Sequence, residues 1–98
     1  MRLISMRAAK AFVNNYKFTQ SNTQVRTYPQ TALYLYGNKI AWKDDTGVYF
    51  TLCGWPTKTT TERLNTLLSF YNHNKIIIKQ GSAYYNGNEI SSTGSYKI

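Results

Sequence analysis

The segment from Thr31 to Cys53 alternates apolar and polar residues, and two glycine-containing turn sequences interrupt it. This pattern restricts the fold more than any other feature of the chain. Gly37-Asn38 suits a two-residue β-hairpin turn, and Asp45-Thr46-Gly47 suits a three-residue turn with the glycine in the left-handed position. Together the two turns predict an antiparallel β-meander over about residues 31–53.

The two turns, each assigned by itself, sort the side chains of the meander onto two faces. One face is expected to carry the apolar residues Leu33, Leu35, Ile40, Trp42, Phe50 and Leu52. The opposite face is expected to carry Tyr34, Tyr36, Lys39, Lys43, Tyr49 and Thr51. Because a slip of one residue would move a whole strand's side chains to the wrong face, the agreement between the turns supports this register.

Two amphipathic helices are predicted, one on each side of the meander in the sequence. Ser5 can cap a helix over about residues 5–16, whose apolar residues recur at helical spacing. Thr59-Thr60-Thr61-Glu62 matches a capping box, with Thr59 as the N-cap, and predicts a helix over about residues 60–71. The leucines of this second helix form one stripe, which we expect to cover the apolar face of the sheet.

Further strands complete the predicted fold. Thr23–Tyr28 alternates as a short strand, and Gln80-Gly81 predicts a C-terminal hairpin over about residues 75–91 that ends in a short strand near Ile90. The fold class is therefore α+β, an antiparallel sheet of hairpins packed against an amphipathic helix. The order is α-β-β-β-β-α-β-β(-β), and residues 1–98 are expected to form a single small domain.

The charge of the chain is strongly basic and unevenly placed. Its 98 residues include 12 lysines and arginines against four acidic residues, which gives a formal net charge of +8. The first 43 residues contain seven of the basic side chains and none of the acidic ones. Such a balance excludes an acidic protein and favours a partner that carries negative charge.

Residues suited to catalysis are few. The chain has one cysteine, Cys53, and one histidine, His73, and no spacing of ligands suggests a metal site. Of the four acids, Asp44 and Asp45 are expected in a turn and Glu62 in the helix cap. We therefore expect no enzyme, no cofactor and no metal, and the single cysteine excludes a disulfide within the chain and favours a reducing compartment.

Nucleic-acid binding is the function that the surface pattern favours. Tyr34, Tyr36, Lys39, Lys43 and Tyr49 interleave rings and ammonium groups on one predicted sheet face, as proteins that stack bases and neutralise phosphates do. A second basic surface is the stripe of Arg7, Lys10 and Lys17 on the first helix. Two purely structural interpretations remain open: these side chains lie on a solvated strand face without a binding role, or the first helix covers the tyrosines.

Binding to a protein is the alternative function. Trp55 is a candidate partner-binding residue, because tryptophan dominates binding hot spots, although a ring beside a proline and just before a helix more often fills the junction between sheet and helix. The basic half of the chain would complement an acidic protein, and an exposed sheet edge near Thr23–Tyr28 would allow a homodimer. No run approaches the ~18–20 apolar residues that a membrane helix needs, so no membrane partner is expected.

Three segments carry a resemblance to a known family. They are Asn22-Thr23-x-Val25, the run from Leu33 to Ala41, and the run Gly54-Trp55-Pro56 through Thr60-Thr61-Glu62-Arg63-Leu64-Asn65. From about Ala9 to Ile90 the chain resembles a family of short bacteriophage-encoded proteins whose domain has no assigned function. The resemblance implies a phage origin and the cytoplasm of an infected bacterium but no activity, and its third segment makes Arg63 a second candidate partner-binding residue. Under the alternative function, the protein would be an inhibitor or adaptor of a host or phage protein such as defence or transcription machinery.

Overall fold

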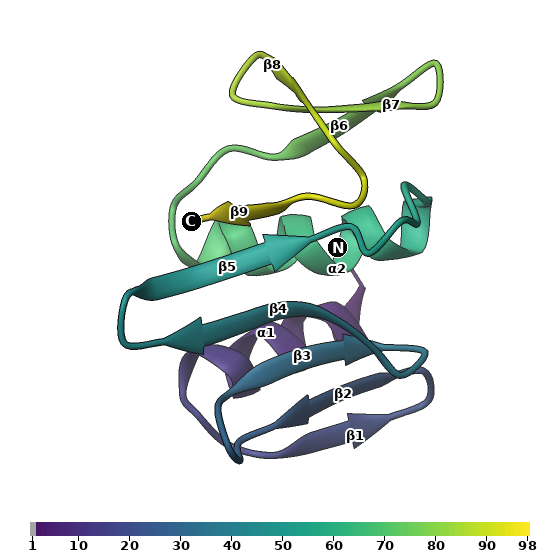
Figure 1. Ribbon diagram of the computed structural model, residues 1–98. Coiled ribbons are helices and arrows are strands. Elements are labelled where there is room, and N and C mark those ends of the chain that lie inside the picture. The colour runs from purple at the N-terminus through teal and green to yellow at the C-terminus, as the bar shows by residue number, and fades with distance from the viewer. Residues whose placement is uncertain (1) are drawn as a thin grey trace.

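Six antiparallel strands form one sheet, and two helices cover one of its faces in the computed structural model, which describes residues 2–98 (Figure 1). The strands follow the order β1-β2-β3-β4-β5-β9, and the helices are α1 (Leu3–Val13) and α2 (Lys58–Phe70). The bounds of these strands are β1 Phe18–Gln20, β2 Thr23–Arg26, β3 Ala32–Leu35, β4 Asn38–Asp44, β5 Gly47–Thr51 and β9 Ser95–Lys97.

A second, three-stranded sheet lies at one end of the molecule (Figure 1). It consists of β6 (Ile76–Lys79), β7 (Ser82–Tyr85) and β8 (Asn88–Ile90). The α+β class and the order of helices and strands are thus confirmed, and β1 and β9 are short strands that the sequence pattern did not predict. The C-terminal hairpin turns at Gln80-Gly81 as expected, with Lys79 paired to Ser82.

The first hairpin of the meander turns one residue earlier than predicted. Leu35 pairs with Asn38, so the two turn residues are Tyr36 and Gly37, both with positive φ (52° and 79°). A β-bulge then places Ile40 as an extra residue, since Tyr34 pairs with Lys39 and Leu33 pairs with Ala41. The bulge keeps Ile40 in the core, although the predicted pairing was wrong.

The second turn also differs from the prediction, and this changes the faces of β4. Asp44 pairs with Gly47, so Asp45-Thr46 forms a two-residue turn and Gly47 is already in the strand. Trp42 consequently pairs with Tyr49, and Ala41 pairs with Phe50. Trp42 therefore leaves the predicted apolar face, and Lys43 moves to the face that the helices cover.

Both helices begin earlier than the sequence suggested. Arg2 is the N-cap of α1 and makes no side-chain capping bond, while Ser5 is buried inside the helix. Thr57 is the N-cap of α2, and its hydroxyl accepts a hydrogen bond from the backbone N–H of Thr60. The predicted caps at Ser5 and Thr59 are wrong because Ser5 and Glu62 bond each other instead.

The core lies between the two helices and the inner face of the six-stranded sheet. Small residues of α1, Ala8, Ala9 and Ala11, are buried against the neighbouring helix and sheet, and Phe12 and Phe50 are fully buried large rings. Asn65 joins α2 to the three-stranded sheet, because its side-chain amide donates to the backbone carbonyl of Ile76 and its oxygen accepts from the Ile76 N–H (3.0 and 2.6 Å). None of the helices within residues 2–98 is long and apolar enough to cross a membrane.

Candidate nucleic-acid interface

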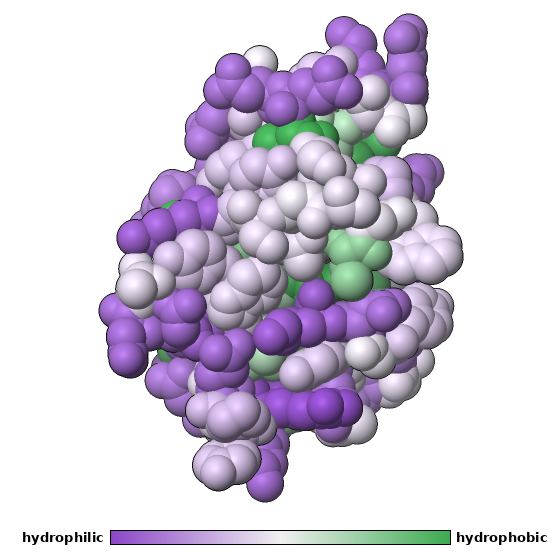
Figure 2. Space-filling model, in the orientation of Figure 1, coloured by the Kyte–Doolittle hydropathy of each residue, from purple (hydrophilic) through white to green (hydrophobic). Residues whose placement is uncertain are grey.

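The face of the six-stranded sheet that points away from both helices is uncovered, and we call it the outer face (Figures 1 and 2). Figure 2 looks onto this face and shows mainly purple and pale surfaces over β1 to β4. The alternation of the strands places these central side chains on it: Gln24, Arg26, Tyr34, Lys39, Trp42 and Tyr49. The first helix therefore does not cover Tyr34 and Tyr49.

Cations on the outer face lie against aromatic rings. The guanidinium carbon of Arg26 is 4.2 Å from the centroid of the Tyr34 ring, and Lys39 Nζ is 5.2 Å from the centroid of Trp42. Trp42 in turn stacks beside Tyr49, with ring centroids 5.8 Å apart and planes 17° apart. These contacts hold two positive charges on the surface without neutralising them, since the quadrupole of a ring carries no net charge.

Lys17 extends the outer face at the edge of the sheet. Together with Arg26 and Tyr28 it lines a shallow hollow of about 290 Å³ beside β1 and β2. Of the predicted basic stripe, Lys17 thus lies next to Arg26, which sequence reasoning left unassigned. The outer face, together with its edge at β1, therefore carries at least three cations: Lys17, Arg26 and Lys39.

The opposite margin of the outer face is partly neutralised. Asp44 lies there, and the hydrogen bonds from the side chain and the backbone of Thr46 hold the pKa of its carboxyl below the ordinary value, with a minor contribution from Lys97. Thr46 also bonds the Tyr49 hydroxyl (2.5 Å). Asp44 therefore offsets part of the positive charge at this margin, where the exposed Lys97 of β9 also lies.

Lys43 does not belong to this face, which corrects the prediction. Its ammonium group donates to the backbone carbonyl of Val13 (3.0 Å) and to the side-chain oxygen of Asn15 (2.9 Å), and it lies 5.0 Å from the centroid of Phe12. Burial lowers the pKa of Lys43. The lysine therefore serves the C-terminal end of α1, where a cation is favoured by the helix dipole.

Arg7 and Lys10 also lie apart from the outer face. Both are exposed on α1, which packs on the other side of the sheet, and Arg7 reaches only Gln20 of the edge strand β1 (3.4 Å). The two basic surfaces predicted from the sequence are therefore on opposite sides of the molecule. Of Arg7, Lys10 and Lys17, the last is the one that lines a hollow together with Arg26 of the outer face within residues 2–98.

Arg63 is a buried residue of the fold and not a surface for a partner. It is 3% exposed, and its guanidinium donates to Thr23 (3.0 Å), Ser5 (2.8 Å) and Glu62 (2.7 Å) and, at 3.5 Å, to Asn22. Burial alone would raise the pKa of Glu62, but hydrogen bonds from Ser5 and the Arg2 N–H, together with Arg63, lower it. The helix α2, the strand β2 and the helix α1 are thus joined by one polar network.

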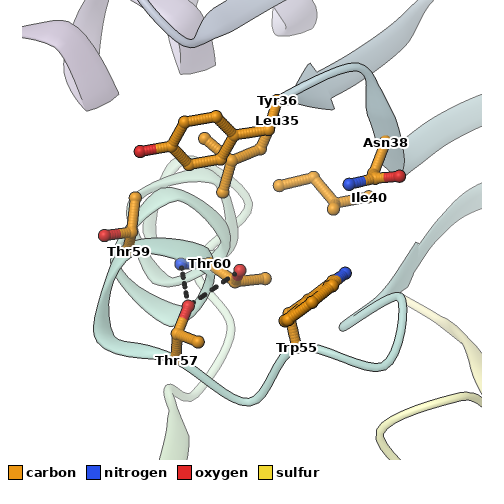
Figure 3. A pocket seen from close by; sticks show the side chains of 8 residues that line it. All are labelled: Leu35, Tyr36, Asn38, Ile40, Trp55, Thr57, Thr59 and Thr60. Carbon is orange, nitrogen blue, oxygen red and sulfur yellow. Dashed lines mark hydrogen bonds between the residues drawn. The ribbon is translucent and has the colours of Figure 1, made fainter.

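Trp55 and Tyr36 are brought together, although the sequence assigned them to different sites. They are 59% and 72% exposed, and both line a hollow of about 390 Å³ between the β3–β4 turn and the start of α2 (Figure 3). The hollow is further lined by Leu35, Asn38, Ile40, Thr57, Thr59 and Thr60. Trp55 is therefore exposed and does not fill the junction between sheet and helix, although the sequence favoured that interpretation.

Sequence reasoning missed two members of the outer face, Arg26 and Trp42. Both follow from the register of the strands. The bulge at Ile40 and the shorter second turn move the Trp42 side chain to the opposite face of the sheet. Pairing with β1 makes β2 an interior strand, on which Arg26 faces outward. The sequence signal was the apolar pair Ile40-Ala41, since two adjacent buried residues in a strand are typical of a bulge. Among residues 2–98, no group of three or more His, Cys, Asp or Glu side chains is placed to hold a metal ion.

The fold and this surface define a small basic α+β protein with one helix-covered and one open sheet face. The chain belongs to the Kyanoviridae Gp96 protein family, a phage protein family whose model matches residues 1–97. The resemblance to bacteriophage proteins is thereby confirmed. Neither a curated protein nor a solved structure matches the chain.

Proposed function

We propose that this protein binds nucleic acid, without catalysis, through the outer face of its six-stranded sheet. The observation that carries the proposal is the position of Lys17, Arg26 and Lys39 on an uncovered face beside half-buried rings. Phosphate groups would meet the cations, which favours binding through release of counterions. The rings Tyr34, Trp42 and Tyr49 would provide a flat support beneath the sugar and base edges.

The distribution of charge supports this proposal over a general role in solubility. The two cations whose partners lie inside the fold, Arg63 and Lys43, contact oxygen atoms of the chain. By contrast, Arg26 and Lys39 on the outer face lie over rings, so their charge is available to an anion. Arg26 and Lys39 thus join positive charge to aromatic rings on one face, whereas the exposed Arg7 and Lys10 of α1 lie on the other side of the sheet.

A fluorescence-anisotropy titration with single- and double-stranded DNA and RNA tests the proposal. We expect binding at about 50 mM salt that weakens steeply by about 200 mM salt. The double variant Arg26→Gln/Lys39→Gln should weaken it at least about tenfold, because two phosphate contacts are lost. The matched control is Arg7→Gln/Lys10→Gln, which removes one arginine and one lysine from α1 and should keep most of the affinity. The absence of binding to all four nucleic acids at low salt would contradict the proposal.

A protein partner is the second candidate, and the exposure of Trp55 favours it. A ring that is 59% exposed beside an apolar hollow is a typical anchor for a partner's side chain. In that case the protein would act as an inhibitor or adaptor of a host or phage protein with an acidic surface. Binding of this kind should survive the higher salt concentration, since an apolar contact is not screened.

A further inference from the structure

The hollow between Tyr36 and Trp55 combines two exposed rings with an apolar floor. Figure 3 shows the two rings on opposite sides of the hollow, with Ile40 and Leu35 between them and Thr60 below. Leu35, Ile40 and Thr60 are buried, so the floor is a fixed part of the core. Rigid rings above a fixed floor form a preorganised site for a flat, apolar group.

The charges around this hollow are placed at its margins. All eight side chains that line it are neutral; the exposed Lys39 follows Asn38 and lies beside Trp42 on the outer face, and the exposed Lys58 follows Thr57 and lines a neighbouring hollow that shares Thr59. Lys39 also belongs to the outer face, so the hollow adjoins the cations of the proposed interface. A ligand that matches this arrangement is neutral and flat at its centre and negatively charged on both sides.

We propose that this hollow, called here the base pocket, receives a single unstacked base of a nucleic-acid strand whose phosphates lie on Lys39 and Lys58. The proposal rests on the proposed function and deepens it, because it makes the protein selective for single-stranded segments. A base within a duplex is stacked on both faces and does not enter such a pocket without being flipped out.

Size and chemistry agree with a base as the occupant. A volume of about 390 Å³ lies at the lower end of the range for small-ligand sites, which is suited to one base with its sugar. The rings of Tyr36 and Trp55 offer stacking, which is sequence-tolerant since every base has a π-face. Asn38 at the rim carries an amide, which both donates and accepts hydrogen bonds and so matches the edge of a base.

The early turn of the first hairpin is what creates the base pocket. In the predicted register Tyr36 would have been a strand residue beside Tyr34 on the sheet. In the structure Tyr36 is the first turn residue, with a φ of 52°, and its ring extends beside the start of α2 (Figure 3). Asparagine accepts this backbone conformation, so Tyr36→Asn removes the ring without straining the turn.

Fluorescence of Trp55 provides the test. In a Trp42→Phe background Trp55 is the only tryptophan, since the chain has two. We expect a single-stranded oligonucleotide to quench this emission with the midpoint that anisotropy gives, and a duplex to change anisotropy but not emission. In the full protein, Tyr36→Asn/Trp55→Ser should weaken single-strand binding at least about fivefold while leaving its salt dependence unchanged. Tyr16→Ser, which removes another exposed tyrosine, is the matched control and should have no effect.

The outcomes separate the base pocket from the proposed function. If single strands bind and Arg26→Gln/Lys39→Gln weakens them, but Trp55 emission and the Tyr36→Asn/Trp55→Ser affinity do not change, the base pocket is overturned and the proposed function stands. The pocket would then be assigned to a side chain of a protein partner. If no nucleic acid changes the anisotropy, both proposals are overturned together.

Discussion

Two arginines on opposite faces of one sheet show how differently this chain uses its positive charge. Arg63 on the helix-covered side is 3% exposed and bonds four side chains from three segments. Arg26 on the outer face is exposed, its guanidinium carbon lies 4.2 Å from the centroid of the Tyr34 ring, and its side chain donates one hydrogen bond, to Gln24 (3.2 Å), among the residues that the structure describes. One guanidinium holds the fold together, and the other is available to a ligand.

The same division applies to the lysines. Lys43 and Lys39 are only four residues apart on β4, and both were predicted on one face. The structure directs Lys43 to the carbonyl end of α1 and Lys39 to Trp42 on the open side. Among the basic side chains that give the net charge of +8, Arg63 and Lys43 therefore stabilise the fold, and Arg26 and Lys39 lie on the outer face.

The largest effect that distinguishes the two faces is expected for Arg63→Leu. Removing the buried guanidinium takes a charged donor from Ser5, Thr23 and the half-buried carboxylate of Glu62, so the free energy of unfolding should fall by about 3 kcal/mol. Urea denaturation followed by circular dichroism measures this loss. Arg26→Leu is the control and should cost less than about 1 kcal/mol; equal losses for the two variants would contradict the division between the faces.

A smaller loss is expected for Lys43→Met, which keeps the aliphatic stem and removes the ammonium group. The backbone carbonyl of Val13 and the oxygen of Asn15 lose a charged donor, and the helix end loses a favourable cation. The free energy of unfolding should fall by about 1 kcal/mol. Lys39→Met, on the same strand, should change stability by less than about 0.5 kcal/mol. A greater loss for Lys39→Met than for Lys43→Met would reverse the assignment of the two lysines.

Acid should remove the stability that ionised Glu62 contributes on the helix-covered side. The folded-state pKa of Glu62 lies below its ordinary value of 4.5, so its ionised form contributes stability that is complete above that value. This contribution is lost as the pH falls from about 4.5 through the lower folded-state pKa. Urea midpoints measured across this range should fall less steeply for Glu62→Gln than for the natural protein, although the variant is less stable at neutral pH. Parallel pH profiles would exclude Glu62 as the responsible group.

The smallest effect on stability is expected for the outer-face pair. Arg26→Gln/Lys39→Gln removes two exposed cations that contact only rings and one neutral side chain, so the free energy of unfolding should change by about 0.5 kcal/mol or less per site. Thermal unfolding of this variant beside the natural protein provides the measurement. A cooperative transition at nearly the same temperature would show that any loss of binding comes from the surface itself, and a large shift would assign these residues to the fold.

Periodicity and turn sequences predicted the α+β class, both helices and the C-terminal hairpin, because these depend on local patterns. They did not predict the register of the first hairpin, since Gly37 can stand first or second in a two-residue turn, and the choice depends on how Ile40 packs against the helices. The Arg63 network joins residues about 40 and 60 positions apart, so no local pattern reveals it. Arg63 was predicted as a candidate for partner binding, whereas its contacts are those of the fold.

The salt dependence of single-strand binding tests most directly whether the outer face is the nucleic-acid interface. The slope of log affinity against log salt concentration changes by about 0.7 for each phosphate contact on a single strand. Arg26→Gln/Lys39→Gln should therefore reduce the magnitude of the slope by about 1.4, while Arg7→Gln/Lys10→Gln leaves it nearly unchanged. An unchanged slope for the outer-face pair, or an equal reduction for the pair on α1, would contradict the assignment.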